Sequence, residues 1–272
     1  MRGARWRWAS WASWAATPWN TSRRAPGLVL TRGGGGELLS RTDAPVGAGV
    51  SSSAAVTVAA SAALLTAAEG AVPGVQRLTE LAYQAERSVG SGAGWMDFLA
   101  CAYGGLRRIE ASTPPTTKHL AATLGTSVVL IDTRERRATA RVLVNKRERL
   151  AAGAVHHRLP RPGPADRRRG HRRHGGAAHR PPQLGDLINR GQELLRHYMK
   201  CSTPLIDRCV AACMTAGAYG AKLTGSGHGG CLFALVPPER ISAVVDAVAG
   251  LPVRPLVLDD TDSKGVLCTR LT

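Results

Sequence analysis

Apolar residues recur at helical spacing in several stretches of the chain. An alanine- and leucine-rich run follows the serines at 51–53, and its composition predicts a helix of roughly fifteen residues. "LGDLINRGQELLRHYM", "STPLIDRCVAACMTAG" and "PERISAVVDAVAG" predict three more helices, and we expect Ser202 to cap the middle one. In "VQRLTELAYQAERSV" the apolar residues share one face of a further helix, namely Val75, Leu78, Leu81, Ala82 and Ala85.

Short apolar runs rich in β-branched residues are interspersed with these helices. "SVVLIDT" at 127–133 and "CLFALV" at 231–236 predict buried strands, and "VRPLVLDD" predicts another near the C-terminus. "GSGAGWMDFLACAYGG" predicts a glycine loop that contains Asp97 and leads into a short helix. Helices and strands in this order indicate an α+β fold.

The formal charge of +17 would by itself indicate a protein that binds nucleic acid. The charge is concentrated in two blocks, since residues 1–41 hold seven Arg and one Glu and residues 156–180 hold eight Arg and one Asp. Neither block contains Lys or a structural period, so we expect no nucleic-acid partner. We also expect residues 1–35 and 156–180 to lack regular packed structure. A solvated basic insert and a segment translated in a shifted frame both account for the second block.

Composition also bears on the cellular setting. A membrane span takes about 18 apolar residues, and we expect no stretch of this chain to qualify and no membrane partner. The six cysteines form no CxxC pair, which favours a reduced, cytoplasmic setting over a disulfide framework. Cys209 and Cys213 lie one helical turn apart, a spacing that fits either metal binding or burial of two small apolar residues. Because no second pair of ligands accompanies them, we favour burial.

A glycine-serine loop, "PVGAGVSSS", stands directly before the first predicted helix. Gly47 and Gly49 let backbone N–H groups approach a ligand, and Ser51, Ser52 and Ser53 add hydroxyls where first-turn N–H groups lack partners. Since the helix dipole is positive there, the loop suits a phosphate group. The alternative is a serine-capped helix behind a glycine turn. The loop is not a Walker P-loop, because no G-K-[ST] follows the glycines.

Two carboxylates and a second glycine loop add further candidates. Glu86, at the end of the second helix, could hold Mg²⁺ beside bound phosphates. Asp97 could accept the proton of an attacking hydroxyl. The alternative is that Glu86 is a solvated helix residue and Asp97 is a turn residue, neither with a role in binding. "TGSGHGGC" at 224–231 could pack against the serine loop or lie along a substrate.

Three segments in this order resemble motifs of the GHMP superfamily of small-molecule kinases, which includes galactokinase, homoserine kinase and mevalonate kinase. "PVGAGVSSSAA" resembles the nucleotide-phosphate loop, and "AERSVGSGAGWMDFLACAYGG" resembles the stretch with the metal-binding Glu and catalytic Asp. "AYGAKLTGSGHGGC" resembles the glycine-rich third motif, and "LIDTRERRATARVL" fits a family strand and the segment after it. The resemblance covers residues 43–150 and 184–268.

The resemblance implies a two-lobed α+β kinase fold with an incomplete N-terminal lobe. Its parts would be a tail at 1–42, an ATP-binding domain at 43–150, a basic segment at 151–183 and a C-terminal domain at 184–272. The family's usual first motif, PGRVNLIGEHTDY in galactokinases, has no counterpart in the 43 residues before the serine loop. We therefore expect a truncated chain with impaired activity.

The resemblance also implies ATP and Mg²⁺ as cofactors. Ser53 and Glu86 would ligate the metal, and Asp97 would act as the base or orient the acceptor hydroxyl. The residues implied to contact the nucleotide are Pro45, Gly47, Gly49, Val50, Ser51, Ser52, Ser53, Gly225, Gly227 and Gly229.

The resemblance implies a small-molecule substrate, but different motifs favour different members of the superfamily. "SSSAA" and "MD" before "LACAYGG" favour galactokinase, whereas "AKLTGSG" followed by "GGC" favours mevalonate kinase. We expect a galactokinase-like sugar kinase. A mevalonate kinase-like enzyme and a non-catalytic kinase remnant remain the alternatives.

Overall fold

The computed structural model describes residues 5–9, 27–31, 35–39, 44–91, 93–110, 112, 114–121, 124–136, 181–258 and 267–271. The chain forms two compact units, Met1–Leu124 with Val257–Thr272 and Gly125–Leu256. The boundary differs from the expected one near 150 because the strand from Ser127 to Asp132 pairs within the second unit. Of the predicted basic segment at 151–183, residues 151–180 lie outside the described residues, and residues 181–183 belong instead to the helix Pro181–Glu193.

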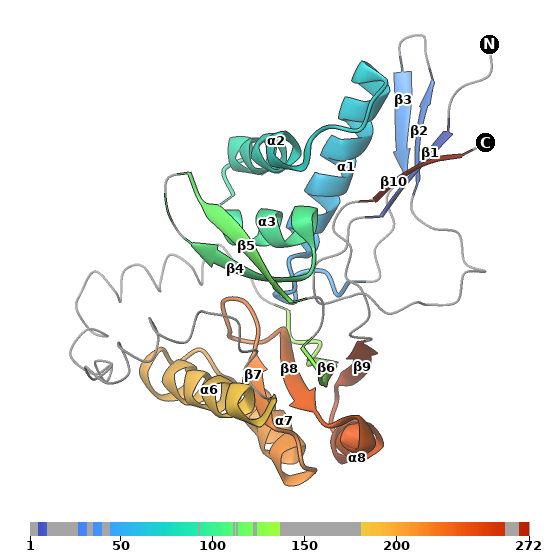
Figure 1. Cartoon of the computed structure of the whole chain (residues 1–272). Coiled ribbons are helices and arrows are strands. Elements are labelled where there is room, and N and C mark those ends of the chain that lie inside the picture. Colours follow the sequence, from blue (N-terminus) through green and yellow to red (C-terminus); the bar gives the residue numbers. More distant parts are fainter. Residues whose placement is uncertain are drawn as a thin grey trace. The chain divides into compact units, whose positions relative to one another are not determined.

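Three helices pack on one another in the first unit: α1 (Ser52–Glu69), α2 (Val75–Ser88) and α3 (Trp95–Tyr103) (Figure 1). Six of the ten buried residues in this core are alanines. Leu78 and Ala82 of α2 are buried as predicted, whereas Val75 and Ala85 are exposed. The buried side chains of this core are Ala54, Ala55, Val58, Ala62, Ala63, Leu78, Ala82, Phe98, Cys101 and Ala102.

Helix α1 is the one helix in the described part of the chain that is long and apolar enough to cross a membrane. This finding corrects the expectation that no stretch would qualify by length and composition. A helix from a protein core passes the same test, and α1 buries Val58, Ala62 and Ala63 against its neighbours. We therefore assign α1 to the core of the first unit.

The first unit also contains two antiparallel sheets. One has the order β10-β1-β2-β3, and the other pairs β4 with β5. The prediction that residues 1–35 lack regular packed structure is corrected by the strands β1 and β2. β1 alternates Arg and Trp and β2 is "GLVLT", so both have a composition that is typical of strands. The strand bounds are β1 (Arg5–Ala9), β2 (Gly27–Thr31), β3 (Gly35–Leu39), β4 (Leu106–Glu110), β5 (Thr116–Ala121) and β10 (Leu267–Leu271).

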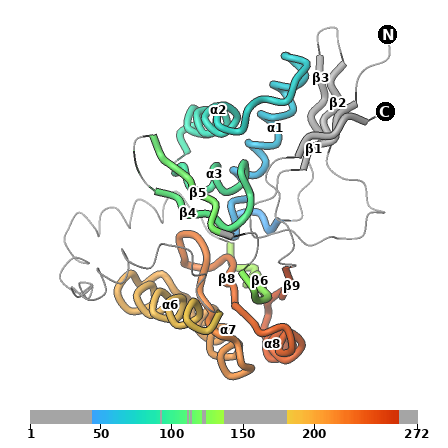
Figure 2. The backbone as a smooth tube through the Cα atoms, viewed as in Figure 1, coloured from blue at the N-terminus to red at the C-terminus, as the bar shows by residue number. Residues whose placement is uncertain are grey.

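The second unit is built on a sheet of order β7-β8-β6-β9, of which Figure 2 labels β8, β6 and β9. The predicted strands at 127–133 and 231–236 are confirmed as β6 and β8, which run antiparallel with Ser127 opposite Val236. Apolar residues of β6, β7 and β8 form one core with two helices, α7 (Pro204–Thr215) and α8 (Ile241–Ala249). The strand bounds are β6 (Ser127–Asp132), β7 (Gly220–Leu223), β8 (Cys231–Val236) and β9 (Arg254–Leu258).

Helix α6 (Pro181–Glu193) lies against the edge strand β7 and continues into a π-helical turn, η1 (Leu194–Tyr198). A Cβ at Gly185 would lie 2.3 Å from the Tyr219 carbonyl oxygen, so only glycine permits this approach. Two amide side chains of α6 bond to the edge, since Ala221 N–H donates to Asn189 Oδ1 and Leu223 N–H donates to Gln192 Oε1. The edge of the sheet is thereby closed to further pairing.

Short connections complete the second unit. A single 3-10 turn, η2 (Pro238–Arg240), leads into α8. The cap of α7 is Thr203, whose hydroxyl accepts from Ile206 N–H, rather than the predicted Ser202. The Ser202 hydroxyl donates instead to Asp207 Oδ1 in the first turn of α7, at 2.6 Å.

Candidate functional site

The serine loop of the first unit turns sharply before α1. Gly47 and Gly49 adopt φ values of 69° and 80°, which favour glycine, and Ser51 is also left-handed at φ 59°. Ser51 is the N-cap of α1 and accepts from Ala55 N–H through its carbonyl, yet its side chain makes no capping hydrogen bond. The first-turn N–H groups are therefore left for another acceptor.

The Ser51 hydroxyl is used elsewhere, because it donates to Asp97 Oδ1 at 2.6 Å. We predicted Asp97 in the glycine loop, and the structure corrects this: it is the third residue of α3. The helix begins before Asp97 because the Trp95 ring stacks on the Tyr83 ring, with 3.9 Å between the ring centroids. The buried Phe98 packs edge-on against the Tyr83 ring as well. These contacts anchor α3 on α2 and bring Asp97 to the serine loop.

Glu86 reaches the same loop from α2. Ser53 Oγ donates to Glu86 Oε1 at 2.5 Å, and Thr57 Oγ1 donates to Glu86 Oε2 at 2.8 Å. The two hydroxyls lie one helical turn apart on α1 and hold both oxygens of the carboxylate. Sequence reasoning missed Thr57, although its i+4 spacing from Ser53 places it on the same helix face.

This donor set suits Mg²⁺. Hydroxyl and carboxylate oxygens are the ligands that Mg²⁺ takes, and the ion usually needs only one or two carboxylates besides phosphate and water. Ser53 and Glu86 already lie within hydrogen-bonding distance of each other, so a single ion could contact both. The described residues contain no cluster of three or more His, Cys, Asp or Glu, so a zinc-type site has no candidate among them.

The remaining predicted residues of the serine loop differ in accessibility. Val50 is buried, and it could therefore offer a ligand only its backbone. Pro45 and Ser52 are half-buried, and Ser52 is the first residue of α1. Val46, a loop residue outside the predicted contacts, is 65% exposed. The loop thus presents mainly backbone groups and serine hydroxyls.

The second glycine loop joins β7 to β8 in the second unit. Gly225, Gly227 and Gly229 all have positive φ, at 60°, 78° and 111°. A Cβ at Gly227 would lie 2.5 Å from the Cys201 carbonyl oxygen, and one at Gly229 would lie 2.8 Å from Glu135 Cβ. Gly227 and Gly229 are therefore required by packing within the unit as well as by turn geometry. The prediction that this loop meets the serine loop stays a prediction.

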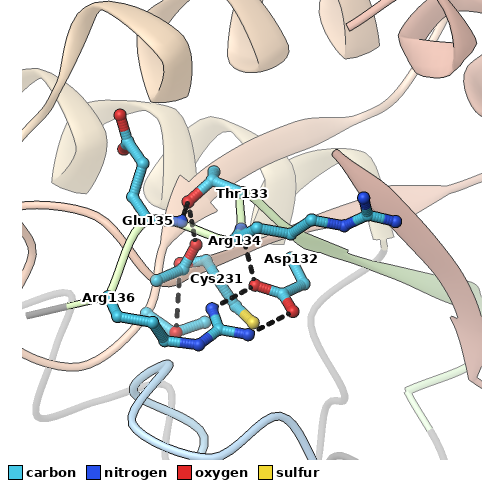
Figure 3. Close-up of polar contacts among 8 residues, drawn as sticks. Asp132, Thr133, Arg134, Glu135, Arg136 and Cys231 are labelled. Carbon is cyan, nitrogen blue, oxygen red and sulfur yellow. Dashed lines mark hydrogen bonds and ion pairs between the residues drawn. The ribbon is translucent and has the colours of Figure 1, made fainter. Parts of the chain in front are cut away.

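The segment after β6 clamps this loop (Figure 3). Thr133 donates to the Gly230 carbonyl from both its N–H and its hydroxyl, and Gly230 N–H donates to the Glu135 carbonyl. Asp132, which is 4% exposed, accepts two hydrogen bonds from Arg136, at 2.8 and 3.0 Å. Burial alone would raise the pKa of Asp132, but hydrogen bonds from Arg136 and from the Arg134 N–H outweigh it and hold the pKa below its usual value.

Five cysteines of the described chain are buried, namely Cys101, Cys201, Cys209, Cys213 and Cys231. Burial raises the pKa of Cys101 to about 12, and the nearby Asp97 charge adds to this. Burial likewise raises the pKa of Cys213 to about 12. These thiols are not activated nucleophiles. The preference for burial over metal binding at Cys209 and Cys213 is confirmed by their complete burial in the core of the second unit.

Two family models match the chain. The GHMP kinases N terminal domain matches residues 20–105, and the GHMP kinases C terminal model matches residues 175–251. Together they cover more than half of the chain, so this protein belongs to the GHMP kinase family. The first match begins at residue 20, whereas the predicted resemblance begins at residue 43.

Individual relatives support the assignment. Galactokinase from Dictyostelium discoideum is 36% identical over 66 residues, which are 24% of this chain and 13% of that protein. Mevalonate kinase from Thermococcus onnurineus (strain NA1) is 38% identical over 80 residues, 29% of this chain and 24% of that protein. The matched segments thus span a quarter or less of these relatives.

A solved structure shows the same fold. L. major mevalonate kinase, determined in complex with R-mevalonate, has a TM-score of 0.63 at 22% identity and aligns with 84% of this chain and 69% of its own. The predicted α+β, two-lobed GHMP-kinase-like fold is confirmed. The chain is shorter than these homologues, as the coverage shows.

Proposed function

We propose that this chain transfers a phosphoryl group from ATP to a hydroxyl of a small polar metabolite. One observation carries the proposal: two carboxylates from different helices reach one glycine-serine loop at a helix N-terminus. Asp97 contacts Ser51 at 2.6 Å, and Glu86 contacts Ser53 at 2.5 Å. A phosphate cradle with one acid suited to a metal and one suited to a proton is what phosphoryl transfer needs.

The serine loop would bind the nucleotide phosphates mainly through backbone groups. Ser51 directs its hydroxyl to Asp97, so the uncapped first-turn N–H groups of α1 and the positive end of its dipole remain to hold the anion. Gly47 and Gly49 carry no side chain that would keep phosphate oxygens away. The 18-residue length of α1 supports a full helix dipole at this end.

Ser53 and Glu86 would hold Mg²⁺, with Thr57 fixing the second oxygen of the carboxylate. Bound Mg²⁺ supplies neutralisation of charge that develops on the phosphates. The protein's part is to place the Glu86 carboxylate. Two hydroxyls on one helix face achieve this by binding one carboxylate oxygen each.

Asp97 would orient the acceptor hydroxyl and take its proton. The hydrogen bond from Ser51 fixes the direction of the carboxylate, and a carboxylate can accept further hydrogen bonds at both oxygens. Placing the acceptor oxygen in line with the phosphoryl group accounts for much of the rate enhancement in this class of reaction.

For the acceptor, we propose a sugar of the kind that galactokinases phosphorylate, because the serine loop and the "MD" context of Asp97 favour that branch. A mevalonate-like acceptor is the second candidate, since relatives of both kinds match at similar identity. A non-catalytic remnant that retains nucleotide binding is the third.

The test is release of ADP by the purified full chain at saturating Mg·ATP, with galactose and then mevalonate as acceptor. We expect Asp97→Asn to lower kcat by about 10²- to 10⁴-fold and to leave ATP affinity nearly unchanged, because a base acts in the transition state. Asp246→Asn, the same change at an exposed position of α8, is the matched control.

Equal effects of the two substitutions would contradict the role of Asp97. Binding of Mg·ATP without turnover of either acceptor would favour the remnant. Failure of the wild-type chain to bind Mg·ATP would refute the proposal as a whole.

A further inference from the structure

Ser51 and Asp97 form the contact of a nucleophile with a base. The Ser51 hydroxyl donates to Asp97 Oδ1 at 2.6 Å. A hydroxyl within about 2.6–3.2 Å of a group that can take its proton is the arrangement that activates serine as a nucleophile. Both residues are half-buried, so neither is sealed off from a ligand in solution.

Three hydroxyls of this region donate to acids, and Ser51 differs from the other two in the acid that it contacts. Ser53 and Thr57 both donate to Glu86, at 2.5 and 2.8 Å, and each engages one oxygen of that carboxylate. Under the proposed function, Glu86 holds the metal ion and Asp97 takes a proton. Ser51 is therefore the hydroxyl of this group whose partner acts as a base.

Ser51 also belongs to the turn of chain that would bind phosphate. It is the N-cap of α1, and its side chain makes no capping hydrogen bond. An N-cap side chain normally reaches the first-turn N–H groups, so a phosphate bound by those N–H groups would lie beside this residue. The hydroxyl, the base and the proposed phosphate cradle thus meet at one residue, all within the first unit.

We propose that Ser51 is itself a phosphoryl acceptor, so that the chain phosphorylates its own Ser51 when Mg·ATP is bound and no small acceptor is present. In this step Ser51 Oγ forms a bond to the γ-phosphorus, and the bond from that phosphorus to the β,γ-bridging oxygen breaks. ADP leaves with the bridging oxygen, and the hydroxyl proton passes to Asp97. The inference rests on the proposed function, because it uses the same ATP and the same base with a different acceptor.

The product would change the site that made it. A phosphoserine at Ser51 carries a charge of about −1.5 to −2 at pH 7, and it would occupy the positive end of the α1 dipole. That end is where the proposed function places the phosphates of the nucleotide. Chains phosphorylated at Ser51 should therefore bind Mg·ATP more weakly than unmodified chains, which makes the modification a form of self-inactivation.

The experiment incubates the purified full chain with Mg·ATP labelled in the γ-phosphate and without any acceptor. We expect the label to approach one phosphoryl group per chain, with a rate constant independent of chain concentration, and mass spectrometry of peptides to locate it at Ser51. Ser51→Gly, which suits the backbone at φ 59°, should take up no label, and Asp97→Asn should label about 10²- to 10⁴-fold more slowly. Ser242→Ala, at an exposed position of α8, is the control and should label like wild type.

Every other outcome counts against the inference. Absence of label from a wild-type chain that binds Mg·ATP, or label at a different residue, would overturn it. So would a rate constant that rises with chain concentration, because transfer would then occur between chains. A wild-type chain that stays unlabelled but phosphorylates galactose or mevalonate overturns this inference alone, whereas one that binds no Mg·ATP contradicts the proposed function as well. Should Ser51→Gly fail to fold, the position of the label in the wild-type chain still decides.

Discussion

A single methyl group added at Gly227 should destabilise the second unit. In Gly227→Ala the new Cβ would lie 2.5 Å from both the Cβ and the carbonyl oxygen of Cys201. Neither atom is the end of a flexible side chain, so the backbone would have to move. The residue also sits at φ 78°, where an L side chain is strained.

The magnitude follows from these two contributions. A left-handed conformation costs a non-glycine residue about 1–2 kcal/mol, and overpacking in a close-packed region costs about 1–3 kcal/mol. The free energy of unfolding should therefore fall by about 2–5 kcal/mol, a large part of the roughly 5–15 kcal/mol that holds a domain together.

Gly250→Ala in the same unit is the matched control. Gly250 has φ −79° and no atom within 4 Å of an added Cβ, so the change should leave the unfolding free energy unchanged or raise it by about 0.4–1 kcal/mol. Urea unfolding followed by circular dichroism measures both variants through their midpoints at constant slope. Identical midpoints for Gly227→Ala and Gly250→Ala would refute the packing argument.

Two further substitutions test the polar clusters. Asp132→Asn should lower the unfolding free energy by about 1–2 kcal/mol at pH 7, toward the lower end of the range for charged hydrogen bonds because Arg136 is half exposed. Because the pKa of Asp132 is lowered in the folded state, its contribution to the free energy of unfolding is present above the unfolded pKa of about 3.9 and is lost as the pH falls through the folded pKa. The urea midpoints of wild type and variant should therefore converge in acid. A constant difference between the midpoints down to about pH 2 would contradict this. Thr57→Val should raise the Mg²⁺ concentration needed for ATP binding about tenfold, because the Thr57 hydroxyl positions Glu86. Thr57→Ser keeps a hydroxyl and should need the same Mg²⁺ concentration as wild type. Equal behaviour of the two variants would exclude this role of Thr57.

Local patterns predicted much of the fold. The helical period of α2 and the β-branched runs of β6 and β8 are properties of short segments, and the structure has these elements close to their expected bounds. Where the prediction was wrong, a tertiary contact decided the outcome. Asp97 is helical because Trp95 stacks on Tyr83 of another helix.

Pairing between strands explains the strands that the sequence did not predict. β1 pairs with β10, which brings Arg5 opposite Leu271. A pattern within one short segment cannot predict a strand partner that lies so far away in the sequence. β5 is the polar segment "TTKHLA", whose strand conformation follows from pairing with β4 rather than from burial. In both cases strand partners, rather than composition alone, determine the conformation.

At the candidate site, residue types were predictable and their pairings were not. The sequence indicated serines for phosphate and two acids for metal and proton, but it left open which serine would serve which acid. The left-handed backbone of Ser51 directs its hydroxyl to Asp97, and the α1 face presents Ser53 and Thr57 to Glu86. Because both acids occupy serine hydroxyls, the uncapped N–H groups at the start of α1 become the main donors for phosphate. A non-glycine residue held at φ 59° costs roughly 1–2 kcal/mol, and its bond to Asp97 explains why a serine with this strain stands where glycine would be free of it.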